Sequence, residues 1–153
     1  MNKIVVASDH GGFKLKEEIK VYLAKKGYDV DDAGAYSGES CDYPQYAYAA
    51  AKKVSEGKVS RGVIVCKSGI GNSIVANKLA GVRAALCYNM TAVKLSRMHN
   101  DSNILVLGSR FTPAAQAKRM VGLWLSTEFE GGRHTRRLRQ IREIEEGVRC
   151  KKR

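Results

Sequence analysis

The sequence lacks the apolar run of about 20 residues that a membrane-spanning helix requires. Its first residues, Met1 to Lys3, lead directly into a short apolar segment and not into the longer apolar core of a secretory signal peptide. The four cysteines form no Cys-x-x-Cys pair and have no histidine at metal-ligand spacing; they are Cys41, Cys66, Cys87 and Cys150. These absences argue against an integral membrane protein, a disulfide-bonded secreted domain and a zinc module, and free thiols predict a cytoplasmic location.

Proline is also scarce, with two residues, and the chain has neither an internal repeat nor a low-complexity linker. A chain of 153 residues with 44% apolar content is expected to form one globular domain that buries about two thirds of its surface without disulfides or metals. We therefore predict a single domain over residues 1–147, followed by a disordered basic tail at 148–153.

Acidic residues are outnumbered, and the formal net charge is +12. Residues 133–153 hold nine Lys/Arg and three Glu, so half of the net charge lies in this segment. No nucleic-acid-binding motif accompanies the basic segment. Such segments are more often solvated faces or phosphate contacts, so we expect neither a nucleic acid nor a membrane as partner.

Apolar segments without polar alternation, typical of strands buried on both faces, alternate with segments of helical periodicity. Strands are expected at 3–8, 28–33, 62–66, 83–88 and 103–107. Helices are expected at 13–26, 44–56, 73–81, 91–98, 112–126 and 133–146. This alternation predicts an α/β fold. In detail, we expect a single-domain, three-layer α/β/α, Rossmann-like (flavodoxin-like) five-stranded parallel sheet in the order 2-1-3-4-5, with a C-terminal helix.

The segment from Gly62 to Ser73 runs from a buried strand into Cys66, then into a glycine-rich turn and a helix start. Gly69 and Gly71 let the backbone turn sharply and approach a ligand closely. Free N–H groups and the positive end of the helix dipole favour an anion there, and the same field should favour the thiolate of Cys66. The alternative is a cysteine that only fills space in the core.

Asp9 and His10 end the first strand, as Cys66 ends the third. In the predicted strand order these strands are neighbours at the point where the order reverses, which is where ligands bind in such sheets. One crevice would then hold Asp9, His10, Cys66 and the loop 67–71.

Three familiar phosphate-binding motifs are absent. The Walker A sequence G-x-x-x-x-G-K-[ST] does not occur, and Gly11-Gly12 alone does not make a dinucleotide-binding fingerprint. A cysteine phosphatase loop needs an arginine six residues after the cysteine, where this chain has Asn72.

Six short motifs occur along the chain: Ser8-Asp9-His10-Gly11-Gly12, Asp42-Tyr43-Pro44, Cys66-Lys67-Ser68-Gly69-Ile70-Gly71, Ala76-Asn77-Lys78, Ser96-Arg97-Met98-His99-Asn100-Asp101 and Glu130-Gly131-Gly132-Arg133-His134. In this combination and order the chain resembles ribose-5-phosphate isomerases of the B type and their galactose-6-phosphate isomerase relatives. The resemblance implies interconversion of aldose and ketose phosphates, with ribose 5-phosphate and ribulose 5-phosphate as the expected pair, and it implies no metal and no cofactor. It also implies a homodimer or homotetramer with sites shared between subunits.

The resemblance assigns catalytic roles to three side chains. Cys66 matches the base that moves a proton between C2 and C1, and a thiolate at a helix start suits that task. Ser68 and the backbone N–H groups of residues 67–71 would stabilise the negative oxygen of the enediolate. His99, at the end of a helix whose dipole stabilises imidazolium, matches the acid that opens the sugar ring. Otherwise His99 would be a helix cap.

The expected substrate-binding residues fall into two kinds. Asp9 and Asn100 would bind sugar hydroxyls, and the loop residues Lys67, Ser68, Gly69, Ile70 and Gly71 would surround the sugar. By the same resemblance, Arg110 matches a further binding position, and the phosphate would be bound by His10, Arg133 and Arg137. The last two are four apart, so they lie on one face of the final helix. Their alternative is a solvated helix face.

Two positions depart from the family pattern. Lys67 stands where glycine is usual, directly after the expected base, and Asn72 is also not the expected residue. We expect Lys67 to alter substrate preference, so allose 6-phosphate, galactose 6-phosphate and a tetrose phosphate remain alternatives. From another class, a non-catalytic sugar-phosphate-binding protein would keep the arginines but would not need Cys66 or His99.

Overall fold

The structure of this chain is a computed structural model, and it describes residues 2–150. Strands and helices alternate in the order β1 (Lys3–Ser8), α1 (Phe13–Lys25), β2 (Asp29–Asp32), α2 (Tyr43–Ser55), β3 (Arg61–Cys66), α3 (Ile70–Ala76), β4 (Ala84–Leu86), α4 (Met90–Met98), β5 (Ile104–Gly108), α5 (Ala114–Ser126) and α6 (Arg133–Cys150). The alternation and the five parallel strands predicted from the sequence are confirmed.

The strand order is β2-β1-β3-β5-β4, so the predicted order 2-1-3-4-5 is wrong for the last two strands. All five residues of β5 are buried, whereas β4 has three residues that are only half-buried. The inner position of a parallel sheet is covered on both faces, which suits the longer, wholly apolar β5. The shorter β4 consequently lies at the edge.

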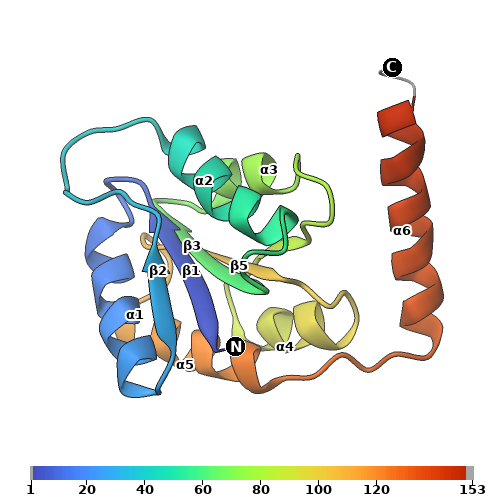
Figure 1. Cartoon of the computed structure of the whole chain (residues 1–153). Coiled ribbons are helices and arrows are strands. Elements are labelled where there is room, and N and C mark those ends of the chain that lie inside the picture. Colours follow the sequence, from blue (N-terminus) through green and yellow to red (C-terminus); the bar gives the residue numbers. More distant parts are fainter. Residues whose placement is uncertain (1, 151–153) are drawn as a thin grey trace.

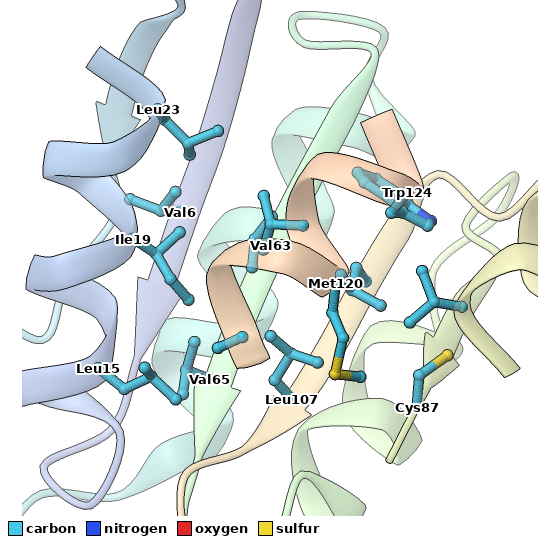
Figure 2. Close-up of a cluster of buried hydrophobic side chains, with 14 of the residues drawn as sticks. Val6, Leu15, Ile19, Leu23, Val63, Val65, Cys87, Leu107, Met120 and Trp124 are labelled. Atoms are coloured by element: carbon cyan, nitrogen blue, oxygen red, sulfur yellow. The ribbon is translucent and has the colours of Figure 1, made fainter. Parts of the chain in front are cut away.

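Helices cover both faces of the sheet, as the three-layer prediction requires (Figure 1). One core cluster joins α1 and α5 to the strands through side chains such as Ile19, Leu107 and Trp124, all fully buried (Figure 2). The opposite cluster joins the alanine-rich face of α2 to α3 and the strands. Because alanine side chains are small, α2 and α3 pack closely over the ends of β1 and β3.

Three helix boundaries differ from the prediction by three residues or more: the start of α3, the end of α3 at Ala76 instead of residue 81, and the end of α6. Helix α3 begins at Ile70, three residues before the predicted start at Ser73, because the glycine-rich turn itself forms the first helical turn. Helix α6 continues to Cys150, so residues 148–150 of the predicted disordered tail are helical. The rest of that tail, 151–153, lies outside the described residues.

Helix α6 stands beside the domain and does not cover the sheet (Figure 1). Near its end, the Glu145 carboxylate accepts the N–H of Gly81 at 3.0 and 2.9 Å. A cavity of about 870 Å³ lies between α6 and the α3–β4 connection, with Ile141, Ile144 and Val148 in its wall. Within residues 2–150, no helix is both long and apolar enough to cross a bilayer.

Candidate active site

The carboxyl ends of β1, β3 and β5 are neighbours in the sheet, where the sequence predicts the crevice. The N–H of Asp9 donates to the Val65 carbonyl, and the N–H of Ser109 donates to the Cys66 carbonyl at 2.8 Å. The Arg110 N–H donates to the Lys67 carbonyl at 3.0 Å. These bonds place the segment after each strand against its neighbour, so the structure brings together Asp9, Cys66, the 67–71 loop and Arg110.

Glycine at two positions makes this close approach possible. A Cβ atom at Gly12 would collide with the Val65 carbonyl, because helix α1 begins directly against β3. Gly69 has a φ of 85°, in the left-handed region that side chains rarely adopt, and a Cβ there would strike Leu86. The tight turn after Cys66 therefore depends on glycine.

The Cys66 thiol is 5% exposed and accepts the N–H of Gly69 at 2.9 Å. Burial raises the pKa of this thiol above its ordinary value, and the Asp9 carboxylate adds to that effect. The N–H groups of Gly69, Ser68 and Asn72 act in the opposite direction but do not outweigh burial. The expectation that the helix start makes Cys66 a ready thiolate is thus wrong for the isolated chain, since desolvating the charged form dominates.

Asp9 and His10 are both held by backbone groups. The Asp9 carboxylate accepts the Gly12 N–H at 2.8 Å, so Asp9 does cap the start of α1. His10 is exposed, and its Nδ1 accepts the Cys41 N–H at 3.2 Å. Nδ1 also lies 3.3 Å from the Cys41 carbonyl, so Cys41 holds Nδ1 in either tautomer, and Nε2 can donate to an anion when it carries the proton.

The side chains of the 67–71 loop line the mouth of the crevice. Ser68 Oγ accepts the Ile70 N–H at 3.3 Å, which leaves its own O–H free to donate. The Tyr88 hydroxyl donates to the Ser68 carbonyl at 2.8 Å and so fixes the loop from the side of β4. Lys67 is exposed, and its Cβ lies against Gly11.

His99 and Asn100 lie near the amino ends of the strands, whereas Cys66 lies at the carboxyl end of β3. Asn103, three residues after Asn100, accepts the N–H of Gly62 at the start of β3, whereas Cys66 ends that strand. The four residues from Gly62 to Cys66 extend about 13 Å at roughly 3.3 Å per residue. Within one chain, the structure therefore does not bring His99 and Cys66 to the same place.

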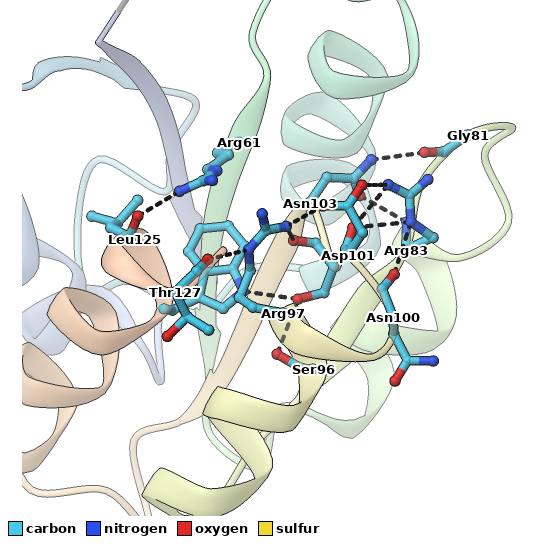
Figure 3. A network of polar contacts seen from close by, with 12 residues as sticks. Arg61, Gly81, Arg83, Ser96, Arg97, Asn100, Asp101, Asn103, Leu125 and Thr127 are labelled. Atoms are coloured by element: carbon cyan, nitrogen blue, oxygen red, sulfur yellow. Dashed lines mark hydrogen bonds and ion pairs between the residues drawn. The ribbon is translucent and has the colours of Figure 1, made fainter. Parts of the chain in front are cut away.

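A buried network holds the segment that carries His99 and Asn100 (Figure 3). The Arg97 guanidinium donates to Asp101 at 2.7 Å, and Arg83 donates to the other Asp101 oxygen at 2.9 Å. Arg83 also donates to the Asn100 carbonyl at 3.1 Å. Because Arg97 is 5% exposed, its charge needs this carboxylate, and the turn after α4 is fixed as a result.

His134 and Glu130, to which the sequence analysis gave no role, lie against His99. The His99 and His134 rings stack with centroids 4.3 Å apart and planes 11° from parallel. The Glu130 carboxylate is 3.6 Å from Nε2 of His99 and 3.4 Å from Nε2 of His134. Desolvation, followed by the nearby His99, lowers the pKa of His134. Both residues belong to the sequence motif 130–134, in which only Arg133 has a predicted role.

This trio is a cluster of potential metal ligands among the described residues, with donor atoms within 4.8 Å of one another. Imidazole binds a metal in the plane of its ring, and two nearly parallel rings do not point at a common centre. We therefore assign no metal to it.

The predicted site residues thus form two groups. The crevice group consists of Asp9, His10, Lys67, Ser68, Gly69, Ile70, Gly71, Arg110 and the Cys66 thiol. The helix-end group consists of His99, Asn100, Arg133 and Arg137. Both arginines of the second group are exposed on the first turns of α6, next to His134.

Similarity to known proteins identifies the family of this chain. The Ribose/Galactose Isomerase family matches residues 4–141. The chain is 45% identical over 146 residues to ribose-5-phosphate isomerase B of Escherichia coli, covering 95% of this chain and 98% of that protein. The chain belongs to the ribose/galactose isomerase family.

Solved structures agree with this membership, and the chain is an aldose–ketose isomerase. A ribose-5-phosphate isomerase B from Clostridium thermocellum superimposes with a TM-score of 0.94 at 46% identity, covering 95% of this chain and 99% of the other. The family is not uniform in substrate. A Pectobacterium atrosepticum member, 40% identical over 136 residues and covering 86% of this chain and 88% of its own, is D-erythrulose-4-phosphate isomerase.

The Asp9 carboxylate gives a direct test of the electrostatics at Cys66. Asp9→Asn removes the negative charge but keeps an oxygen that accepts the Gly12 N–H. We expect the thiol pKa of Cys66 to fall by up to about one pH unit, because thiolate no longer forms beside a carboxylate. The measurement is a pH titration of thiolate absorbance, taken as the difference between each protein and its Cys66→Ala counterpart.

Asp29→Asn is the matched control, since Asp29 begins β2 at the other edge of the sheet and is exposed. It should leave the midpoint unchanged. A midpoint that stays constant or rises in Asp9→Asn would show that the Asp9 charge does not act on the sulfur.

Proposed function

We propose that this chain interconverts ribose 5-phosphate and ribulose 5-phosphate through an enediolate, with Cys66 as the base and His99 as the ring-opening acid. The observation that carries the proposal is the Cys66 sulfur, buried at the end of β3 and surrounded by the N–H groups of its own loop. A base and a set of fixed donors on one turn are what proton transfer next to a carbonyl needs.

The proposed steps of the isomerisation use His99, the Cys66 thiolate, and the Ser68 hydroxyl with the N–H groups of the 67–71 loop. His99 gives a proton to the ring oxygen while the C1 hydroxyl passes its own proton to water, which opens the furanose to the aldehyde. The Cys66 thiolate then takes the proton from C2, and the aldehyde oxygen becomes the enediolate oxygen. The free Ser68 O–H and the N–H groups of residues 67–71 stabilise that negative charge. The proton of the C2 hydroxyl then passes to O1, which moves the negative charge to the C2 oxygen. Cys66 returns its proton to C1, and the C2 carbonyl of the ketose forms.

The raised pKa of Cys66 fits a base of this kind. A thiolate that burial destabilises holds its proton more strongly once it has received it, so it is a stronger base toward a C–H bond. The cost is a smaller fraction of thiolate in the empty site. Donors from the loop, among them the Gly69 N–H at 2.9 Å from the sulfur, offset part of this cost.

The phosphate would be bound by cations from both groups. His10 offers Nε2–H at the mouth of the crevice, and Arg110 follows β5 into the same region. Arg133 and Arg137 offer two exposed guanidinium groups on one face of α6.

We further propose that the active site forms between two copies of the chain, with the crevice group from one and the helix-end group from the other. The separation of Cys66 and His99 within one chain, at opposite ends of β3, supports this arrangement. The exposed apolar side chains of α6 support it too, because Ile141, Ile144 and Val148 are between 49% and 68% exposed. A homodimer or homotetramer would cover them.

Proton exchange tests the proposed chemistry. Ribose 5-phosphate is incubated with the protein in heavy water containing a chelator, and the products are followed by NMR. We expect ribulose 5-phosphate to form with deuterium at C1, because the proton held on Cys66 exchanges with solvent. Cys66→Ala should lose turnover by at least about a thousandfold, the loss expected when a proton-transferring side chain is removed.

Cys87→Ala is the control, because Cys87 is also a buried free cysteine but lies on the other side of the sheet from the loop. Its activity should remain. Turnover that survives in Cys66→Ala would mean that another residue is the base.

A second prediction concerns Lys67, whose exposed side chain stands beside Gly11 at the crevice mouth. We expect it to change the preference for sugar length, because its cation and stem occupy space that glycine would leave open. The relative that acts on a four-carbon ketose phosphate shows that substrate length varies in this family.

The measurement compares kcat/KM of Lys67→Gly and the parent for four-, five- and six-carbon aldose phosphates. A change of several-fold in the ratios is expected, since one pocket contact is worth roughly 10-fold or more. Lys78→Gly, an exposed lysine after α3, controls for the loss of charge. Unchanged ratios in Lys67→Gly would remove Lys67 from the determinants of specificity.

A further inference from the structure

Asn72 is a fully buried amide that finds no hydrogen-bond partner among the described residues. Its relative exposure is 0%, and both Oδ1 and Nδ2 lack a partner. Burying a donor and an acceptor without partners destabilises a fold, and such groups in native structures call for an explanation. Asn77, at the end of the same helix, is the contrast, because its amide donates to two carbonyls and accepts one N–H.

The position of Asn72 places this amide beside the Cys66 sulfur. Asn72 and Ala76 are one turn apart, and they are the buried residues of α3, so this side of the helix faces the sheet. Ala76 packs in the same cluster as Ile64, and Cys66 follows Ile64 by two residues on the same side of β3. The backbone N–H of Asn72 is also among the groups that lower the pKa of the Cys66 thiol.

The surroundings offer the amide little else. The cluster beneath α3 is built from aliphatic side chains, among them Ala7, Ala47 and Val106. Cys66 lies on the same side of β3 and is the nearby group whose hydrogen-bonding character changes when it loses its proton. The amide has no hydrogen-bond partner among the described residues, the sulfur included, whereas a thiolate would accept N–H from Nδ2.

We propose that Asn72 is a positioning residue for Cys66, whose Nδ2–H binds the sulfur once the thiol has given up its proton. It takes no part in bond breaking and acts only through Cys66. A contribution of Asn72 to catalysis rests on the proposed role of Cys66 as base, whereas an effect of Asn72 on the pKa of Cys66 does not. The Asn72 amide is then unpaired in the structure because its partner, the Cys66 thiolate, exists only when the thiol has lost its proton.

The test is the thiolate titration of Cys66 in Asn72→Leu, which keeps the branching and the number of side-chain heavy atoms and removes the amide. We expect the midpoint to rise by about one pH unit, a tenfold loss of thiolate at a fixed pH below the midpoint. The melting temperature should stay the same or rise, because an unpaired buried amide has been replaced by carbon. The charged groups next to the sulfur, Asp9 and Lys67, are unchanged in this variant.

Asn77→Leu is the matched control, with the opposite pattern expected: a lower melting temperature and an unchanged midpoint. Asn72→Ala provides a second variant in case leucine disturbs the packing, and it should raise the midpoint as well. An unchanged midpoint in folded Asn72→Leu and Asn72→Ala would overturn the proposal. The titration contains no substrate, so failure to isomerise ribose 5-phosphate would leave its outcome unaffected.

Discussion

Burial of a thiol at the carboxyl end of a central parallel strand is the constraint on which this site depends. Cys66 is 5% exposed because β1, β3 and β5 end together and α3 begins directly above them. The same burial that makes the thiolate costly makes it a strong base, and the donors of the turn at Gly69 offset part of the cost. The tight glycine turn is therefore required both for the burial of Cys66 and for the N–H donor that acts on its sulfur.

The second constraint is the separation of the two residue groups. Helix α4 runs back along the sheet, so its last turn, with His99, lies at the edge where the strands begin. The ion pairs of Asp101 with Arg97 and Arg83 fix the turn after α4 at that end of the strands, away from the thiol. Helix α6 stands beside its own domain, a position from which it can contact a second copy of the chain (Figure 1).

The sequence predicted what depends on local pattern and missed what depends on comparison between distant segments. The strand Lys3–Ser8 was predicted at its observed bounds because its four central residues are all apolar. The exchange of β4 and β5 was missed because the relative burial of two strands decides it. The crevice group follows from neighbouring strand ends, but the raised pKa of Cys66 needs its packed surroundings. The stacking of His134 on His99 joins residues 35 apart and carries no local signal.

Complementation between two inactive variants tests the central claim most directly. Cys66→Ala and His99→Asn are prepared separately, shown to be inactive, then mixed and refolded so that the subunits exchange. Random pairing makes half of the dimers hybrid, and each hybrid holds one intact site, so about a quarter of the parental activity should return. If mass spectrometry confirms the hybrids and activity does not return, the site does not form between two copies of the chain.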